Sequence, residues 1–287
     1  MRSPTAAEPE LVDLLHLGRP MVIGAWLVGD VIVDPGPSSC LQRLLAAVEH
    51  RPPRALALTH IHLDHAGASG SLARRFPDLE VWVHERGAPH LIDPSKLLAS
   101  AARLYGEEMQ RRWGEVLPVA AERIRVLGGG ESIGPFRVAY TPGHAPHHVC
   151  YLHEPTQWAF TGDLAGVRIG EGDVHAPTPP PDIDLRAWSA SLEVIERWSP
   201  RRLALTHFGV YGDVAAHLAA MRAQLDEAAR MARELDAASF AAAVRARFAA
   251  AGPQTAAAYE QASPPLLGFA GLTRYLDRSG QRRERER

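Results

Sequence analysis

Short apolar runs bounded by turn residues recur along the first 212 residues. They comprise residues 22–28 and 31–34 around Gly29-Asp30, then 55–58, 80–84, 124–127, 136–140, 149–152, 158–161 and 202–205. Runs of this length between Gly, Pro and Asp predict β-strands. Residues 40–50, 66–75 and 185–197 instead have apolar positions three and four apart, which predicts helices. This alternation is typical of an α/β fold.

Two longer segments have a helical pattern. Residues 87–121 lie between two predicted strands, and we interpret them as a helical insertion, either a lid or a structural insertion that packs elsewhere. Residues 213–250 are strongly helical, and a further short helix is expected over 263–276. We therefore predict a catalytic domain over 1–212, with the lid at 87–121, and a helical extension over 213–287. The extension should pack on the main domain, because no low-complexity linker precedes it, and it ends in a charged tail over 279–287.

The densest group of ionisable side chains follows the predicted strand 55–58. His60, His62, Asp64 and His65 lie within six positions there. Buried histidines each need a hydrogen-bond partner, and leaving one unsatisfied costs a few kcal/mol. A metal ion removes this cost, since imidazole and carboxylate are ligands of zinc, iron and manganese. His144, Asp163 and His207 also follow apolar runs, so loops at one sheet edge are expected to converge on one site.

One pentapeptide occurs twice. Residues 56–60 and 203–207 both read Leu-Ala-Leu-Thr-His, and each copy ends at a candidate ligand. Two equivalent strands of this kind favour an architecture of two similar halves. Chance similarity between two strands rich in Leu and Ala is the alternative.

Four motifs in order resemble the signature of the metallo-β-lactamase-fold hydrolase superfamily. They are the H-x-H-x-D-H run at 60–65, Thr141-Pro142-Gly143-His144, Thr161-Gly162-Asp163 and Leu205-Thr206-His207. The resemblance covers residues 11–215. It implies a four-layer αββα sandwich with metal ions at one edge, a helical insertion and a helical C-terminal extension.

The resemblance also implies roles for individual residues. His60, His62 and His144 are expected to bind one divalent ion, Asp64, His65 and His207 a second, and Asp163 both. Zinc is the expected metal, with iron or manganese as alternatives. A hydroxide held between the ions would attack a carbonyl carbon, with Asp64 and Asp163 as catalytic residues. Asp34 and His148 are expected to support the ligands, and Tyr105, His147 and His175 are candidate substrate contacts.

The resemblance is nearest to the glyoxalase II-like branch, which implies hydrolysis of a thioester, ester or lactone. The alternative is an oxygenase similar to persulfide dioxygenases, which use this fold with a single iron. Metal content separates these two hypotheses, because hydrolysis requires two ions and the oxygenase one iron.

Composition narrows the class of partner and the compartment. The formal net charge of −2 and the pI near 6.7 give no reason to expect nucleic acid or an acidic membrane as a partner. Cys40 and Cys150 are too few for a disulfide scaffold, and no signal peptide or run of about 20 apolar residues is present. We expect a cytoplasmic enzyme with a small-molecule substrate, and a homo-oligomer is compatible with the sequence. Lys96, the only lysine, is interpreted as compositional bias.

Overall fold

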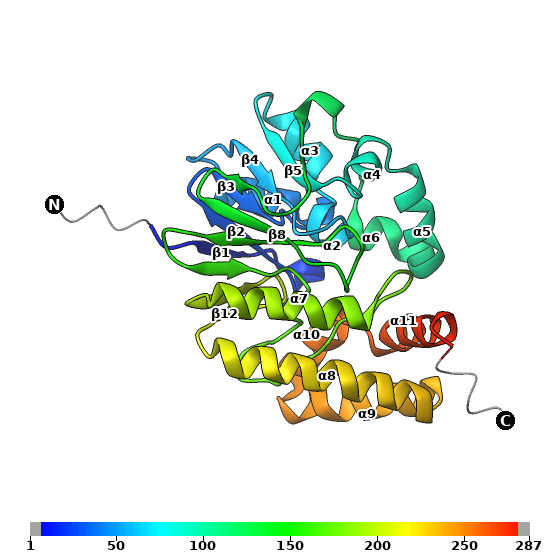
Figure 1. The fold of residues 1–287 in the computed structure, drawn as a ribbon. Helices are drawn as coiled ribbons and strands as arrows, with labels where there is room; N and C mark the ends of the chain where they lie inside the picture. Colours follow the sequence, from blue (N-terminus) through cyan, green and yellow to red (C-terminus); the bar gives the residue numbers. More distant parts are fainter. Residues whose placement is uncertain (1–6, 281–287) are drawn as a thin grey trace.

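Two six-stranded β-sheets form the centre of the protein in the computed structural model, which describes residues 7–280 (Figure 1). The first sheet contains, in spatial order, β1 (Glu10–Asp13), β2 (Gly24–Val28), β3 (Val31–Val33), β4 (Ala55–Ala57), β5 (Glu80–His84) and β6 (Ile124–Leu127). The second contains β12 (Gly209–Tyr211), β11 (Arg202–Leu205), β10 (Trp158–Phe160), β9 (Val149–His153), β8 (Phe136–Tyr140) and β7 (Ser132–Ile133). In the first sheet β3 to β6 are parallel, and in the second only β10 and β11 are.

The inner strands of each sheet are buried on both faces. Successive side chains of a strand point to opposite faces, so Ala55 and Ala57 of β4 face the second sheet while Leu56 packs toward the helices. Aromatic residues fill the space between the sheets, and they include Trp26, Trp82, Phe136, Tyr151 and Phe160. Apolar residues on both faces explain why these strands read as continuous apolar runs in the sequence.

Helices form the two outer layers. The first sheet is covered by α1 (Leu41–Ala47) and α3 (Ser69–Arg75), and the second by α7 (Leu185–Trp198) (Figure 1). The predicted helix 66–75 is in fact two pieces, because α2 (Leu63–Ala66) ends before α3 begins. Helix, sheet, sheet and helix give the four-layer αββα sandwich, so the predicted fold class is confirmed.

The segment between β5 and β6 is helical, but only in part. It contains α4 (Ala88–Ile92), α5 (Ser95–Tyr105) and α6 (Met109–Trp113), with a 3-10 turn (Gly106–Glu108) between the last two. Residues 114–120 have no regular secondary structure, which corrects the expectation of helix up to residue 121. Gly114, at φ +70°, ends α6, because a left-handed residue cannot continue an α-helix.

The C-terminal part is made of four helices, α8 (Val214–Glu234), α9 (Ala237–Ala250), α10 (Pro253–Ala262) and α11 (Pro265–Arg278). The predicted helix 213–250 is interrupted at Leu235-Asp236, where the Asp236 carboxylate accepts a bond from the Ser239 N–H and caps α9. The helical pattern breaks at Ala251-Gly252, and Pro253 then begins α10, since proline suits the first helical position. The predicted charged tail lies outside the described residues from position 281 onward.

The four helices contact the rest of the chain through specific bonds. Arg222 of α8 pairs with Glu196 of α7 at 2.9 Å. Thr178 donates a hydrogen bond to the carbonyl of Gly268 in α11 at 3.1 Å. The second contact places α11 beside the loop between β10 and α7.

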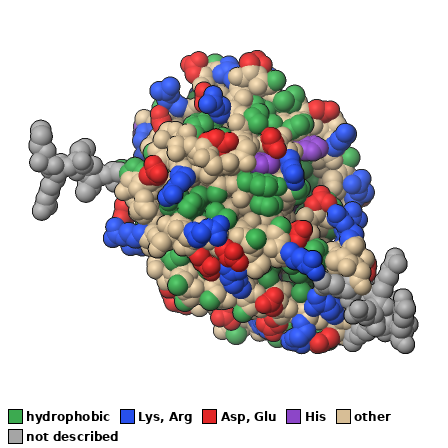
Figure 2. Space-filling model, in the orientation of Figure 1, with side chains coloured by type: hydrophobic (Ala, Val, Ile, Leu, Met, Phe, Trp, Pro, Cys, Tyr) green, Lys and Arg blue, Asp and Glu red, His purple; other side chains and the backbone are tan. Residues whose placement is uncertain are grey.

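Acidic and basic side chains are mixed over the face drawn in Figure 2, in agreement with the small net charge. Within residues 7–280, no helix has the length and apolar character needed to cross a membrane.

Candidate metal centre

All seven predicted metal ligands lie together where strands of the two sheets end. His60 follows β4, His144 follows β8, Asp163 follows β10 and His207 follows β11. The donor atoms form two groups, and within each group they lie within 4.8 Å of one another. We call His60, His62 and His144 the first ligand set, and Asp64, His65 and His207 the second ligand set. Asp163 is grouped with the first set and also contacts the second.

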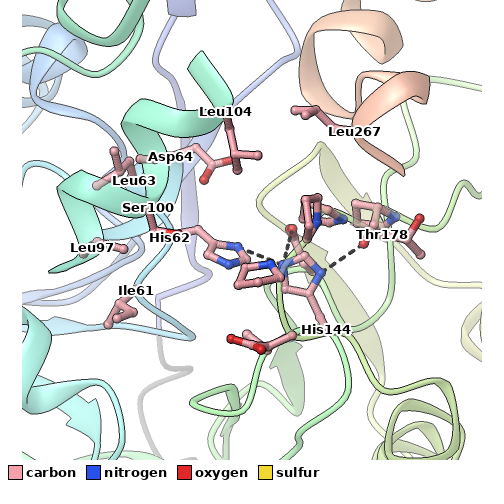
Figure 3. A pocket seen from close by; sticks show the side chains of 18 of the residues that line it. Ile61, His62, Leu63, Asp64, Leu97, Ser100, Leu104, His144, Thr178 and Leu267 are labelled. Carbon is pink, nitrogen blue, oxygen red and sulfur yellow. Dashed lines mark hydrogen bonds and ion pairs between the residues drawn. The ribbon is translucent and has the colours of Figure 1, made fainter. Parts of the chain in front are cut away.

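In the first ligand set, three ring nitrogens face one another. Nδ1 of His62 lies 3.0 Å from Nε2 of His60. It also lies 3.0 Å from Nε2 of His144 (Figure 3). The Thr59 hydroxyl donates to Asp34, so its oxygen accepts the Nδ1–H of His60 at 3.1 Å. His144 donates its Nδ1–H to the carbonyl of Pro177 at 3.0 Å. These outer bonds fix both tautomers and leave the Nε2 lone pairs directed inward.

In the second ligand set, outer hydrogen bonds again hold the Nδ1 atoms of the histidines. His65 donates its Nδ1–H to Asp34 at 2.8 Å, and His207 donates its Nδ1–H to the carbonyl of Val22 at 2.6 Å. Their Nε2 atoms lie 3.3 and 3.5 Å from Oδ1 of Asp163, and Nε2 of His207 lies 3.4 Å from Oδ2 of Asp64.

Three buried atoms at the centre lack a hydrogen-bond partner among the described residues. They are Nε2 of His65, Nε2 of His207 and Oδ1 of Asp163. Leaving such groups unsatisfied costs about 1–3 kcal/mol each, so their convergence calls for a shared partner. Imidazole lone pairs and carboxylate oxygens are the donors that zinc, iron and manganese bind, and the residues therefore fit divalent metal ions.

The two sets differ in charge. Burial, reinforced by the neighbouring imidazoles, lowers the pKa of His60 well below its usual value and lowers that of His62 to about 3. Burial also lowers the pKa of His144. The first ligand set is therefore neutral near pH 7, which is the form that binds a metal.

Carboxylates reverse the effect in the second ligand set. Burial alone lowers the pKa of His65 and His207, but the charges of Asp163 and its neighbours outweigh it and raise both pKa values. Burial raises the pKa of Asp64, yet His65 and His207 outweigh burial and hold it below the usual range. A metal bound here has to displace protons from imidazole.

Asp34 lies at the junction of the two sheets. Its Oδ1 accepts the Thr59 N–H at 2.8 Å, and its Oδ2 accepts the hydroxyls of Thr59 at 2.7 Å and Thr206 at 3.0 Å and the Nδ1–H of His65. Asp34 is fully buried and has φ +50°, a conformation that Asp tolerates better than most residues. It thus touches a ligand histidine and both copies of the repeated pentapeptide.

His148 is packed beside the first ligand set. Its ring stacks on His60 at 5.1 Å, and its Nδ1 lies 3.0 Å from the Thr141 hydroxyl. A Cβ added to Gly162 would lie 2.9 Å from its Nε2 and 2.4 Å from the Thr59 hydroxyl oxygen. The glycine before Asp163 is therefore required by close approach to the groups that surround the ligands.

A cavity of about 460 Å³ opens above the two ligand sets. One wall is α5, and the opposite wall is formed by residues 177–182 with the ends of α10 and α11. Figure 3 shows Leu104 and Leu267 on opposite sides, with His62 and His144 at the floor.

Two of the three candidate substrate residues line this cavity. Tyr105 contributes to the α5 wall, and His147 lies beside His62, with ring centroids 5.8 Å apart. His175 is not among the lining residues, and here the prediction is wrong. Its ring packs edge-on against Phe248 at 4.9 Å, and its backbone pairs with Val167. The fold turns this part of the loop toward α9.

Sequence analysis missed other lining residues, most notably Arg86 and Lys96. Lys96 was attributed to compositional bias, although its uniqueness was visible. The roles of Thr59 and Thr206 as donors to Asp34 were also missed, and the repeated pentapeptide was the signal for them.

Comparisons with known proteins identify relatives in sequence and neighbours in fold. The hydroxyacylglutathione hydrolase of Salmonella paratyphi A is 33% identical over 138 residues, covering 46% of this chain and 41% of that protein. The chain thus spans less than half the length of this curated relative. The archaeal metallo-beta-lactamase superfamily protein ST1585 from Sulfolobus tokodaii has a similar structure, with a TM-score of 0.68 and 20% identity over 92% of this chain and 98% of that one. The di-iron-bound form of TTHA1623 matches with a TM-score of 0.52 and 27% identity over 78% and 95%.

The family model of the metallo-beta-lactamase superfamily matches residues 21–207. This range covers more than half of the chain and includes all seven predicted ligands. A hydroxyacylglutathione hydrolase is among the relatives that match part of this chain. The chain therefore belongs to the metallo-beta-lactamase superfamily, as its motifs predicted.

Proposed function

We propose that the chain is a dinuclear metallohydrolase that cleaves a thioester, ester or lactone. The observation that carries this proposal is the presence of two complete ligand sets with Asp163 between them. A single-metal enzyme needs only one such set. The completeness of the second set is therefore the reason to favour hydrolysis over the mononuclear iron oxygenase.

We assign one ion to His60, His62 and His144, one to Asp64, His65 and His207, and a shared position to Asp163. Two such ions supply a nucleophilic hydroxide near neutral pH and polarise a carbonyl group. Zinc is the proposed metal, while iron and manganese bind the same donors. The di-iron-bound form of the similar protein TTHA1623 keeps iron among the candidates.

The chain's own groups position the reaction. Side chains are anchored from outside by the bonds to Asp34, Val22 and Pro177, so the ligand nitrogens are held in place before substrate arrives. The side chain of Asp64 is 22% exposed, against 6% for Asp163, so Asp64 is the more exposed of these two carboxylates that line the cavity. Its lowered pKa keeps it ionised at neutral pH, and it accepts a hydrogen bond from the attacking group.

The cavity above these residues receives the substrate. Tyr105 and His147 are proposed to contact it, and Asp34 and His148 to support the ligands from behind. Water adds to the carbonyl carbon, the bond to sulfur or oxygen breaks, and the proton passes to the leaving atom. Both cysteines are buried and unpaired, which suits the proposed cytoplasmic location.

Elemental analysis of the protein as purified, combined with assays on thioesters and lactones, tests this proposal. We expect close to two equivalents of zinc, manganese or iron per chain, and hydrolysis of at least one acyl substrate. A single iron, with oxygen consumed on addition of a persulfide and no hydrolysis, would replace the proposal by the oxygenase.

A further inference from the structure

The wall formed by α5 changes character along its length. Lys96, Ser100 and Leu104 are four residues apart, so they lie on one face of the helix, and all three line the cavity. Leu97, Ala101 and Tyr105 form the adjacent row and line it as well. Eight residues at 1.5 Å per residue separate Lys96 from Leu104 by about 12 Å. The helix therefore presents a cation at one end of the cavity and apolar groups at the other.

A second cation lies in the wall of the cavity. Arg86 lines the cavity, and its guanidinium lies over the Tyr140 ring at 5.7 Å. The Tyr140 hydroxyl donates to the carbonyl of Pro146, which also lines the cavity. Arg86 is thereby placed on the side of the first ligand set.

Neither cation forms an ion pair within the described residues. Asp93 lies close enough to Lys96 to be influenced by its charge, but the Asp93 carboxylate accepts bonds from Ser95. Across the cavity, Asp182 lies 3.5 Å from Arg278, so its negative charge is partly offset. Lys96 and Arg86 are therefore cations of the cavity wall that no carboxylate of the described residues pairs with.

The other end is apolar. Tyr105 packs edge-on against Trp113 at 5.1 Å, and Trp113 stacks on the buried His16 at 5.4 Å. Leu104 and Leu267 face one another across the cavity (Figure 3). Burying an acyl chain of moderate size against these side chains is favourable by about 25 cal/mol per Å² of apolar surface.

We propose that the substrate is an elongated acyl compound with an anionic group on one side of the scissile carbonyl, bound by Lys96 and Arg86, and an apolar group on the other, bound between Leu104, Tyr105 and Leu267. This inference rests on the proposed hydrolysis, because it assigns the two ends of the substrate relative to the ligand sets. The anion is a carboxylate, sulfonate or phosphate, since lysine and arginine bind all three.

Two pairs of thioester probes test the proposal, and they differ in the side of the carbonyl that carries the charge. The first pair is the hexanoyl thioester of 3-mercaptopropionate and that of the neutral 3-mercaptopropionamide. The second pair places the charge on the acyl side, as the hexyl thioester of succinate and the corresponding succinamide. Only one of the two pairs can place its charge toward Lys96 and Arg86 while its carbonyl lies at the ligand sets. In that pair we expect kcat/KM for the anionic member to exceed that for its neutral partner by about five- to twentyfold, and this ratio should fall at high salt.

Two variants of α5 separate recognition from a general effect of charge. Lys96→Gln should lower the anionic-to-neutral ratio severalfold, and adding Arg86→Gln should bring it close to one. Arg103→Gln removes the same charge from an exposed position on the same helix outside the cavity, and it should leave the ratio unchanged. A ratio near one for both pairs in the wild-type protein would overturn the proposal while leaving hydrolysis intact.

Binding of a non-hydrolysable pair decides the proposal independently of turnover. S-hexyl-3-mercaptopropionate and its amide replace the thioester carbonyl by a methylene group, and their affinities are measured by calorimetry. Tighter binding of the acid, lost in Lys96→Gln with Arg86→Gln, would support recognition even if none of the thioesters is hydrolysed. In that case the proposed function fails and the anionic subsite stands, whereas equal affinities contradict the subsite.

Discussion

The ends of β4 and β11 are identical in sequence and contact the same carboxylate, yet their histidines differ in chemistry. Thr59 and Thr206 occupy the same place in the two copies of Leu-Ala-Leu-Thr-His, and both donate to Oδ2 of Asp34. The two sheets are thus joined through one carboxylate. The equivalence explains why both copies deliver a histidine to the same centre.

The surroundings then make the two histidines different. His60 is held by its own neighbour, Thr59, and burial, reinforced by the surrounding imidazoles, lowers its pKa. His207 is held by the carbonyl of Val22 from another strand end, and Asp163 and Asp64 raise its pKa despite burial. The pentapeptide sets where the side chain lies, and the residues that meet it from elsewhere set its charge.

The largest effect is expected from removing Asp163, the carboxylate that contacts both ligand sets. Asp163→Ala should abolish turnover, by at least about a thousandfold, because Asp163 contacts both ligand sets. Metal content measured by elemental analysis should fall together with kcat. The exposed Asp226→Ala serves as control and should retain both. Full activity in Asp163→Ala would refute the assignment of the site.

A second test removes the carboxylate that joins the two strand ends. Asp34→Asn keeps the size of the side chain and tolerates φ +50°, but its amide nitrogen cannot accept the bonds from Thr59, Thr206 and His65. We expect the free energy of unfolding to fall by about 3 kcal/mol, measured by denaturant titration of the metal-free protein. A loss below about 0.5 kcal/mol would mean that Asp34 does not tie the ends together.

Much of this arrangement was predictable from local sequence. The ligands follow apolar runs directly, so their positions were fixed by strands whose pattern was easy to recognise. Short elements were missed, among them β1, β7 and β12, because two to four residues give too little periodicity. α10 was missed because Gly252-Pro253 reads as a stop signal, although the same pair starts a helix.

The walls of the cavity were harder to predict than its floor. Lys96 and Leu267 come from segments 171 residues apart, and no local pattern states that α5 and α11 face each other. His175 was misplaced for the same reason, since its distance along the chain from Asp163 did not show which way the loop turns. Long-range packing, rather than local propensity, decides these contacts.

His175 lies outside both ligand sets, and its pKa can be compared with those of the histidines at the strand ends. Burial, with Arg247 nearby, lowers its pKa to about 4, whereas in the unfolded chain it is near 6.5. The unfolded state binds the proton more readily, so the stability present above pH 6.5 is lost as the pH falls toward 4. His175→Leu should reduce the loss between pH 7 and 4 by up to about 2 kcal/mol.

Urea titrations at pH 7, 5.5 and 4 measure this difference. The exposed His50→Leu is the matched control and should leave the pH dependence as in the wild-type protein. Parallel curves for His175→Leu and the wild-type protein would show that His175 is protonated as easily in the fold as outside it.

The smallest expected changes in unfolding free energy come from replacing the threonine of each pentapeptide. Thr59→Val and Thr206→Val each remove one hydroxyl from Asp34 with little change of shape. In each variant the lost bond to Asp34 should lower the free energy of unfolding by about 1 kcal/mol. Thr59→Val should cost about 1 kcal/mol more, because the Thr59 hydroxyl also accepts the Nδ1–H of His60, whereas His207 keeps its bond to Val22.

The double variant then shows whether the two ends act as one unit. Because both hydroxyls donate to the same oxygen, the two costs should deviate from additivity by at least about 0.5 kcal/mol in a double-mutant cycle. Only Thr59→Val should also weaken metal binding, since it alone frees a ligand ring. Equal costs, simple additivity and unchanged metal affinity would mean that identical strand ends behave identically, and that the difference between His60 and His207 does not begin at the threonines.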